Sequence, residues 1–375
     1  MSVQTELNRL NTAKSDIVTA ITNKGVTVPS STKLDGMASL IDGISAGGFP
    51  NGTEWTKSGY TKSAASLCYG NGVWVLTGSG IYYSTDGKNW TASNVTSGSN
   101  GCCHFANGLW VASVGSNGLY YSTDGKTWTR SNITSYKFYS VNYANGLWIA
   151  CSHNYGGIYS SADGKSWVAR KGSTNAKVSC YANGLWVVGG TDGSWYGATS
   201  LYYSSDDGMT WSSMNIGTDD VAAICYANGL WVAGGGTGVS GSEMISLGLF
   251  YSTNGTSWTQ SNIMGGWFES IYNANGLWVA GGQRGIYYST DGKNWTQSNI
   301  TTSVHSICNA CGIWVAGSSY IDYSTGNGIH YSVDGKTWAR SDTTVGTFLK
   351  VLNENGIWVG ASSSGVSYSV TWEPS

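Results

Sequence analysis

The chain has 375 residues, of which 54 are glycine, 13% are aromatic and only 11% are charged. Its 19 basic and 21 acidic residues give a net charge of −2 at pH 7, so no basic excess is present to hold a phosphate backbone. This balance argues against nucleic acid as a partner. Abundant glycine and aromatic residues with few charges indicate an all-β chain of short strands joined by tight turns.

The first residues of the chain, MSVQTELNRLNTAKSDIV, are polar and charged. A secretory signal needs an apolar run of about 7 residues or more in this region, and no stretch of the chain approaches the length of a transmembrane helix. We therefore expect a protein made in the cytoplasm, with no signal peptide and no membrane insertion.

Apolar residues recur at alternating spacings of four and three along the first 21 residues. This pattern predicts a short coiled-coil-like helix, which needs partners to be stable at a length of about 20 residues. A second apolar pattern between residues 34 and 44 predicts another helix, followed by a glycine-containing linker. We assign residues 1–48 to a helical attachment and oligomerisation module, with a homotrimer favoured; a helical cap on the main domain is the alternative. The expected oligomerisation contacts are Val3, Leu7, Leu10, Ile17 and Ile21.

Residues 49–375 contain one repeated unit with two turn signals. The first is Asn-Gly or Cys-Gly followed by an aliphatic residue and tryptophan, and it occurs eight times at intervals of 36 to 47 residues. The second, exemplified by Ser84–Trp90, follows each of the first seven copies and contains Asp-Gly or Asn-Gly. Both turns favour a positive φ and are strong hairpin signals, so each repeat predicts four antiparallel strands. The first-signal tryptophans are Trp74, Trp110, Trp148, Trp186, Trp231, Trp278, Trp314 and Trp358.

A single four-stranded unit cannot bury both of its faces, whereas units stacked around an axis bury them against one another. We therefore predict a β-propeller of about eight four-stranded blades, with seven as the alternative, preceded by the small α-helical N-terminal module. The last repeat lacks its second turn, while residues 51–56 resemble an outer strand without a blade. We expect this N-terminal strand to complete the last blade and close the ring. An open β-solenoid is the linear alternative.

The segment Ser204–Trp211 matches in full the Asp box of sialidases and related propellers, Ser-x-Asp-x-Gly-x-Thr-Trp, and the other copies are one residue shorter. The resemblance implies a structural role for these turns. The aspartate oxygen would accept hydrogen bonds from turn N–H groups, the tryptophan would pack between strands, and the turn would lie opposite the ligand-binding face.

A second resemblance lies within the first 48 residues. The stretch KSDIVTAITNKGVTVPSSTKLDGMASLIDGI resembles short modules of tail and baseplate proteins from phages and prophages of Gram-positive bacteria. Such modules attach or oligomerise, so the resemblance implies that other tail or baseplate proteins are partners. It also implies that the propeller is a host-facing part of a virion tail, which agrees with the absence of a secretory signal in the sequence.

The two faces of the predicted propeller differ in sequence variation. From the first to the second tryptophan signal there are 16 to 19 residues in four repeats, but 25, 27 and 24 in the fourth, fifth and seventh. The additional residues lie on the face opposite the conserved turns. Flat aromatic rings beside polar groups suit a sugar, which presents an apolar C–H face and a rim of hydroxyls. The candidate ligand-binding residues on this variable face are Tyr136, Phe138, Trp195, Tyr196, Asp219, Asp220, Trp267, Phe268, Glu269, Arg284, Tyr320, Asp322 and Tyr323.

These features predict a receptor-binding protein of a phage tail or tail-like particle that binds bacterial cell-surface carbohydrate. One alternative is a glycan-cleaving enzyme. The five arginines do not form a sialidase pattern, but other glycosidases need only two carboxylates about 5–10 Å apart, and the variable loops contain several. A secreted lectin or adhesin is a further alternative. The sequence motifs assign no catalytic residue, no metal and no cofactor.

Overall fold

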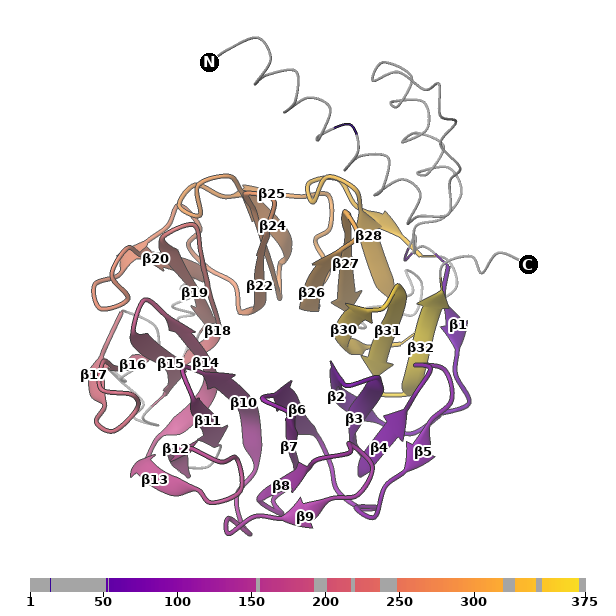
Figure 1. The fold of residues 1–375 in the computed structure, drawn as a ribbon. Helices are drawn as coiled ribbons and strands as arrows, with labels where there is room; N and C mark the ends of the chain where they lie inside the picture. The colour runs from indigo at the N-terminus through magenta and orange to yellow at the C-terminus, as the bar shows by residue number, and fades with distance from the viewer. Residues whose placement is uncertain are drawn as a thin grey trace, which may run out of the picture. The chain divides into compact units, whose positions relative to one another are not determined.

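A computed structural model describes residues 14, 52, 54–152, 156–191, 201–216, 220–236, 248–319, 328–341 and 346–370. The compact unit Gly52–Ser369 is an eight-bladed β-propeller (Figure 1). Among the described residues of this unit there are strands and turns but no helix. The predicted helices of residues 1–48, with Val3, Leu7, Leu10, Ile17 and Ile21, lie outside the described residues except at residue 14. No helix in the described part of the chain is long and apolar enough to cross a membrane.

Each blade is a four-stranded antiparallel sheet whose first strand lies nearest the propeller axis (Figure 1). Blades 1 to 3 consist of β2 (Ala64–Gly70), β3 (Val73–Gly78), β4 (Ile81–Ser84) and β5 (Thr91–Ala92); β6 (Gly101–Ala106), β7 (Leu109–Val114), β8 (Leu119–Ser122) and β9 (Thr129–Arg130); and β10 (Phe138–Ala144), β11 (Leu147–Ser152), β12 (Gly157–Ser161) and β13 (Val168–Lys171). Blades 4 to 6 consist of β14 (Asn175–Ala182), β15 (Leu185–Thr191), β16 (Leu201–Ser204) and β17 (Ser212–Met214); β18 (Asp220–Ala227), β19 (Leu230–Gly236), β20 (Gly248–Ser252) and β21 (Thr259–Gln260); and β22 (Phe268–Ala274), β23 (Leu277–Gly282), β24 (Gly285–Ser289) and β25 (Thr296–Gln297). Blade 7 consists of β26 (Val304–Ala310), β27 (Ile313–Ser318), β28 (Ile329–Ser332) and β29 (Ala339–Arg340), and blade 8 of β30 (Phe348–Glu354), β31 (Ile357–Ser362), β32 (Gly365–Val370) and β1 (Thr56–Lys57).

The last blade is completed by a strand from the N-terminal side of the propeller. In β1, Thr56 pairs with Tyr368 of β32. The Trp55 indole is 4% exposed and its Nε1 donates to the Gly52 carbonyl at 2.5 Å, which is the bond that other blades make between the box tryptophan and glycine. The predicted closure is therefore confirmed. Eight blades are confirmed as well, and the seven-bladed and open alternatives are wrong.

The core lies between blades. The tryptophan on the second strand of each repeat is at most 4% exposed. The clusters around these rings join neighbouring blades, and one of them packs Leu76 of blade 1 against Val359 and Ala361 of blade 8. The hydrophobic contacts are thus continuous across the point where the two ends of the ring meet. Burial of such aromatic side chains is the main stabilising contribution to a ring of this kind.

The box turns are held by their aspartates. In blade 3, Ser161 Oγ donates to Asp163 Oδ1 at 2.9 Å, and the same oxygen accepts the backbone N–H groups of Lys165 and Ser166 at 2.8 Å. Partial burial raises the pKa of Asp163, but the donated hydrogen bonds lower it further, so the net pKa lies below its usual 3.8. These hydrogen bonds show that the aspartate stabilises the turn, as the resemblance to the Asp box implied. Hydrogen bonds also lower the pKa of Asp86, Asp124, Asp206, Asp291 and Asp334, with the bond from Thr210 contributing most at Asp206, and Asn254 accepts through its amide oxygen.

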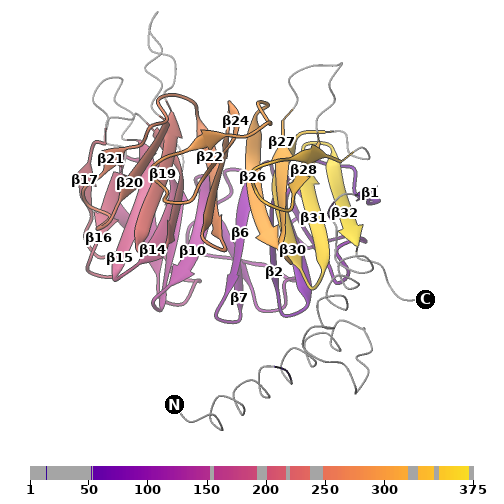
Figure 2. The ribbon, with the colours of Figure 1, turned by 90° about the horizontal axis from the view of Figure 1, so that it is seen from above.

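Both types of hairpin turn lie on one face of the ring. Asn145, in the Asn-Gly turn of blade 3, donates from Nδ2 to Oδ1 of Asp207, in the box of blade 4, at 2.8 Å. We call this face the turn face; the connections at the opposite strand ends, between second and third strands and between blades, form the loop face (Figure 2). Gly52 belongs to the box-like turn of blade 8 and so lies on the turn face.

Asparagines that follow the outer strands clamp neighbouring blades together. Asn132 of blade 2 accepts the backbone N–H of Trp167 of blade 3 at 2.8 Å and donates to its carbonyl at 2.9 Å. Both bonds recur in three further pairs. These asparagines thus have a structural role. The other pairs are Asn94 with Trp128, Asn262 with Trp295, and Asn299 with Trp338.

Replacing Asn132 with alanine should lower the free energy of unfolding by about 2 kcal/mol, because two inter-blade hydrogen bonds are lost. Urea denaturation measures this change. Ser135→Ala, three residues further along in the same loop, is the matched control and should change the free energy by less than about 0.5 kcal/mol. Equal stability of the two variants would contradict the clamp.

His330 on β28 makes stability depend on pH. Its position in the repeat is that of Phe250 in blade 5. Burial, and then the charge of Arg340, lower the pKa of His330 from 6.5 to about 4. The unfolded chain therefore binds a proton below pH about 6.5 that the folded chain binds only near pH 4, so stability is lost as the pH falls between these values. The buried Nδ1 also has no hydrogen-bond partner in the structure.

His330→Phe should remove this loss and make the protein more stable than the wild type at pH 4 by up to about 3 kcal/mol. Unfolding free energies at pH 7, 5.5 and 4 measure the effect. Wild type and variant losing stability in parallel over this range would show that His330 is not the group responsible.

Candidate functional site at the propeller axis

The eight inner strands surround the axis (Figure 1). Each leads into an Asn-Gly or Cys-Gly turn on the turn face, so each begins on the loop face. The sixth residue before the Asn-Gly or Cys-Gly turn differs in chemistry among these strands. Blades 1, 2, 5 and 8 have small or apolar residues there, whereas blades 3, 4, 6 and 7 have aromatic or charged ones. In blade order, the residues at this inner tier are Ala65, Gly101, Tyr139, Lys177, Ala222, Glu269, His305 and Leu349.

Lys177 of blade 4 connects several blades. Its ammonium group pairs with the Asp220 carboxylate of blade 5. Its Nζ lies 4.7 Å from the centroid of a Trp267 ring of blade 6 and 5.9 Å from that of Tyr139 of blade 3. Only a side chain that extends toward the axis can contact residues from blades on both sides in this way. A cation over an indole that is shielded from water gains about 1–2 kcal/mol.

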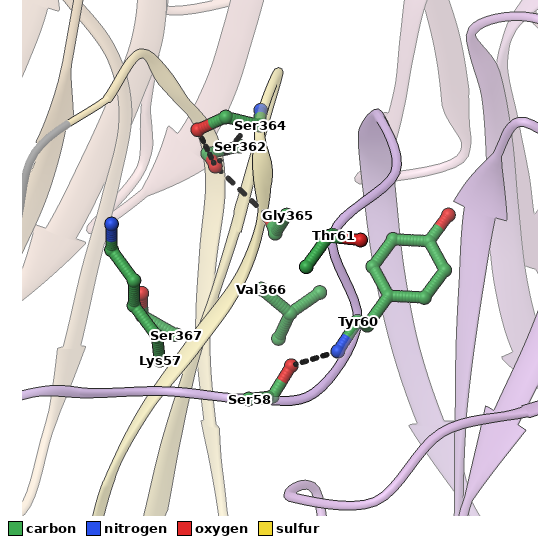
Figure 3. A pocket seen from close by; sticks show the side chains of 9 residues that line it. All are labelled: Lys57, Ser58, Tyr60, Thr61, Ser362, Ser364, Gly365, Val366 and Ser367. Carbon is green, nitrogen blue, oxygen red and sulfur yellow. Dashed lines mark hydrogen bonds between the residues drawn. The ribbon is translucent and has the colours of Figure 1, made fainter.

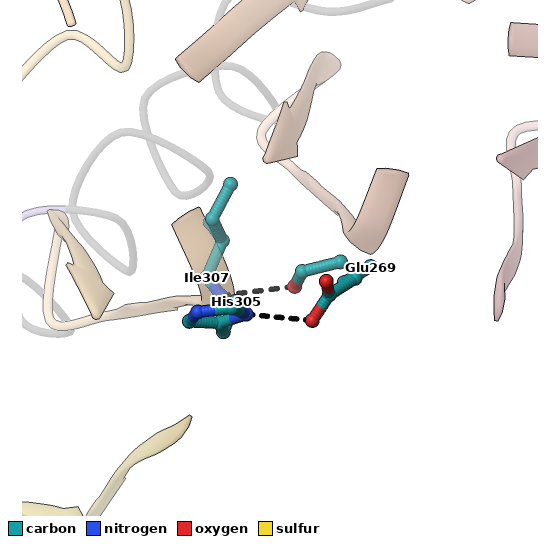
Figure 4. Close-up of polar contacts among 4 residues, drawn as sticks. Glu269, His305 and Ile307 are labelled. Carbon is teal, nitrogen blue, oxygen red and sulfur yellow. Dashed lines mark hydrogen bonds and ion pairs between the residues drawn. The ribbon is translucent and has the colours of Figure 1, made fainter. Parts of the chain in front are cut away.

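A second pair lies beside this group. His305 Nδ1 of blade 7 is 2.6 Å from Glu269 Oε2 of blade 6, and the two side chains face each other (Figure 4). The neighbouring Ser270 Oγ accepts the backbone N–H of Ile307 at 2.9 Å, which fixes the two inner strands relative to each other. The Glu269 side chain remains 37% exposed. We call Tyr139, Lys177, Asp220, Trp267, Glu269 and His305 the axial cluster.

The Tyr139 hydroxyl is a hydrogen-bond donor of the axial cluster. Burial, and then the negative charge of Asp220, raise the pKa of Tyr139, so its hydroxyl stays protonated and can donate a hydrogen bond at neutral pH. Two aromatic rings, an ammonium group, two carboxylates and an imidazole therefore gather on the loop side of the inner strands. Such an arrangement offers both stacking surfaces and hydrogen-bonding groups to a polar ligand.

Two further predicted residues lie on the loop face. Arg284 is exposed in the connection between β23 and β24. Its Cδ lies 3.6 Å from the point where a Cβ added to Gly266 would be, so Arg284 lies beside the loop that holds Trp267. Tyr136 is 43% exposed, and its ring is 6.4 Å from that of Tyr159 on a third strand, farther from the axis. Its φ of 72° is strained for a bulky residue.

The structure corrects the assignment of Phe138 and Phe268. Their side chains are 0% and 1% exposed, and each packs edge-on against the tyrosine of its own third strand, with ring centroids 5.5 Å apart. They occupy the seventh position before the turn, whose side chains lie in the core. The rings of these two candidate ligand-binding residues are therefore not accessible to a ligand on the loop face. Asp220 is also buried, and it contributes through its pair with Lys177 rather than as a free carboxylate.

The remaining predicted residues, Trp195, Tyr196, Asp219, Tyr320, Asp322 and Tyr323, lie outside the described residues. Three members of the axial cluster, Tyr139, Lys177 and His305, were missed by sequence reasoning. A signal for them was present, because each replaces the alanine or glycine of other repeats at the same distance from the turn.

A small pocket of about 120 Å³ lies on the loop face where blade 8 is closed (Figure 3). Hydroxyl groups of serines and Thr61 line it together with the side chain of Tyr60, and Ser362 Oγ donates to the Gly365 carbonyl at 2.9 Å. Burial, and then the nearby Tyr82, raise the pKa of Tyr60 to about 12. Ligand pockets typically exceed about 300 Å³, so the axial cluster is the better candidate site.

Comparisons with known proteins show the fold alone. No protein-family model and no curated protein matches the chain. The computationally designed Ika8 protein is similar in structure, with a TM-score of 0.62, 10% identity, and coverage of 84% of this chain and 98% of that one. Sqt1 of Saccharomyces cerevisiae has a TM-score of 0.59 and 11% identity, covering 87% of this chain and 100% of Sqt1. YCF48, solved bound to a D1 peptide, has a TM-score of 0.50 and 14% identity, covering 84% and 94%. The protein is thus an eight-bladed β-propeller of four-stranded blades.

Proposed function

We propose that the protein binds bacterial cell-surface carbohydrate through the loop face of its propeller, as the receptor-binding protein of a phage tail or tail-like particle. The observation that supports this proposal is the axial cluster, in which Lys177 lies between the rings of Trp267 and Tyr139. An aromatic face can stack on the C–H face of a pyranose, while the surrounding charged groups exchange hydrogen bonds with its hydroxyls.

The proposal includes one ligand site per chain. The turns and boxes repeat around the whole ring, but the axial cluster is assembled from residues that depart from the repeat in blades 3, 4, 6 and 7, with Asp220 from blade 5. A ring of equivalent sites would instead use residues present in every blade. We therefore expect one carbohydrate ligand per propeller.

Attachment through residues 1–48 agrees with the position of the site. Gly52, the first residue of the propeller unit, lies on the turn face, opposite the axial cluster. If that segment gathers several chains, the propellers bind one cell together, and weak single sites become strong through effective concentration.

A truncated protein lacking residues 1–48 should therefore bind cells at least tenfold more weakly than the full chain, while binding soluble oligosaccharide with unchanged affinity. Cell-binding isotherms and calorimetry with soluble fragments measure the two quantities. Equal binding of cells by the two proteins would contradict the oligomerisation role of the segment.

The function itself is tested by incubating the full-length protein with Gram-positive cell walls and with their isolated polysaccharides. Both retention of the protein and release of sugar are recorded. Retention without release is the expected result. Release of sugar would make the protein a glycosidase, and retention on none of the walls would contradict carbohydrate binding. Two of the loop carboxylates that a glycosidase could use, Asp220 and Glu269, are described, and they pair with Lys177 and His305.

A further inference from the structure

Two thiols lie together in the interface between blades 1 and 2. Cys68 is on β2 and Cys103 on β6, the inner strands of these blades, and both residues are buried. They belong to one hydrophobic cluster, which also contains Trp110 of blade 2. All eight cysteines of the chain are described and free, and no other two of them share a cluster. This pair is therefore the place where two thiols meet across a blade interface.

The contacts of Cys103 place its sulfur beside Cys68. Cys103 Sγ lies 3.7 Å from the Val75 carbonyl oxygen and 3.9 Å from Ser66 Oγ. Val75 is the cross-strand partner of Cys68. Ser66 precedes Cys68 by two residues on β2, so the two side chains leave the same side of that strand. The Cys103 sulfur is thus held against the part of blade 1 from which the Cys68 side chain projects.

The adjacent Cys102 does not take part in this contact. Consecutive side chains of a strand point to opposite sides, and Cys102 packs in the cluster between blades 2 and 3, with Val141 and Trp148. A disulfide between the neighbours Cys102 and Cys103 would need both sulfurs on one side of β6. The partner that the fold offers to Cys103 is Cys68.

The environment of the pair makes its oxidation slow. Burial, and then the hydrogen bond with Cys103, raise the pKa of the Cys68 thiol well above its usual 9.0. The thiolate is the form that attacks a disulfide, so few molecules are reactive at neutral pH and the reaction accelerates as the pH rises. Only a small oxidant can enter an interface that is closed to this extent.

We propose that Cys68 and Cys103 form a thiol-oxidation site, at which a small disulfide converts the pair to a disulfide that joins blades 1 and 2 and stabilises the ring. One cysteine thiolate attacks the small disulfide, so a mixed disulfide forms and one small thiolate leaves. The other cysteine thiolate attacks the protein sulfur of the mixed disulfide, so the Sγ–Sγ bond forms and the second small thiolate leaves. The cysteines are oxidised, the small disulfide is reduced, and the two cysteine protons end on the two small thiols.

The crosslink would stabilise the propeller near its closure. It connects residues 35 apart in the chain, in the interface next to the one between blades 8 and 1. Closing a loop of this length lowers the entropy of the unfolded chain. In a reducing cytoplasm the pair stays as thiols, and in an oxidising environment the crosslink forms. The inference does not depend on the proposed function, since neither thiol belongs to the axial cluster.

The test treats the full-length protein with hydroxyethyl disulfide at about pH 8.5, beside an equal sample kept in dithiothreitol. The protein is then unfolded, its remaining thiols are alkylated, and its crosslinked peptides are identified by mass spectrometry without reduction. Thermal unfolding is followed in parallel. The variants are Cys103→Ser, whose position is occupied by Ser179 in blade 4, and the matched control Cys102→Ser, whose position is occupied by serine in blades 1, 3, 6 and 7.

The wild type and Cys102→Ser should form the crosslink between Cys68 and Cys103, and oxidation should raise their thermal midpoints by about 5 °C. Cys103→Ser should form no crosslink and unfold at the same midpoint after both treatments. The inference would be overturned if Cys68 and Cys103 of the wild type stayed free or paired with other cysteines. A crosslink that left the midpoint unchanged would overturn the stabilising role. The peptide map of the wild type decides the pairing even where a variant does not fold.

Discussion

Replacement of Trp55 with alanine is expected to lower the free energy of unfolding by about 3–5 kcal/mol, the range for truncating a buried tryptophan. The ring is nearly fully buried, packs in a cluster with Val315 of blade 7 and Trp358 of blade 8, and bonds to the Gly52 carbonyl. It fixes the strand that completes blade 8. Its removal therefore weakens the closure of the ring as well as leaving a cavity.

Urea denaturation followed by tryptophan fluorescence measures the loss at Trp55. Trp267→Ala is the matched control, since it deletes an indole that lies on the loop face and is only partly buried. The control loses its contact with Lys177 but little buried surface, so it should lose no more than about 2 kcal/mol. A comparable loss in both variants would mean that the N-terminal strand contributes little to closure.

Trp267 is expected to matter more for ligand binding than for stability. Trp267→Ala and Lys177→Met should each weaken binding of the retained wall carbohydrate by about tenfold, close to 1.4 kcal/mol, because each removes one partner of the cation–aromatic contact. Lys177→Met also leaves the Asp220 carboxylate buried without its cation, which should lower stability as well. Trp267→Ala is therefore the cleaner test of the two.

Dissociation constants from calorimetry measure this loss. Met264→Ala is the control, because Met264 is 75% exposed in the same connection between blades 5 and 6. Its affinity should match the wild type. Unchanged affinity in Trp267→Ala would place the carbohydrate site elsewhere on the propeller.

The fold was predictable because local chemistry repeats. An Asn-Gly turn such as Asn71–Gly72 specifies a tight hairpin through its two positive φ angles, 43° and 78° in the structure. The box motif specifies the second hairpin of each blade, and the orphan strand ending in Trp55 and Thr56 specifies closure. These signals act over a few residues, so no long-range information was needed to count the blades.

The candidate site was only partly predictable, because a bulge changes which side chains face the axis. Between Phe138 and Ser140 the register of β10 shifts by one residue, and the same shift occurs between Phe268 and Ser270 of β22. Such a shift exchanges the buried and exposed sides of a strand. The buried phenylalanines were therefore assigned to the surface, while Tyr139, next to one of them, was missed.

The contacts of Lys177 could not be predicted from sequence for a different reason. Its partners Asp220 and Trp267 are 43 and 90 residues away along the chain, in blades 5 and 6. They meet it because Asp220 begins the inner strand of the adjacent blade 5 and Trp267 directly precedes the inner strand of blade 6, and the inner strands converge toward the axis of a closed ring. Repeat spacing predicts the order of the blades. It does not predict which side chains of the inner tier extend far enough to contact one another.

Calorimetric titration of the full-length protein with fragments of the wall carbohydrate that retains it is the most direct test of a single axial site. We expect one ligand bound per chain in the wild type, and about tenfold weaker binding in Trp267→Ala with the stoichiometry unchanged. A stoichiometry near eight ligands per chain, or a single site that Trp267→Ala leaves intact, would show that the ligand binds to the repeated blades or to another loop instead.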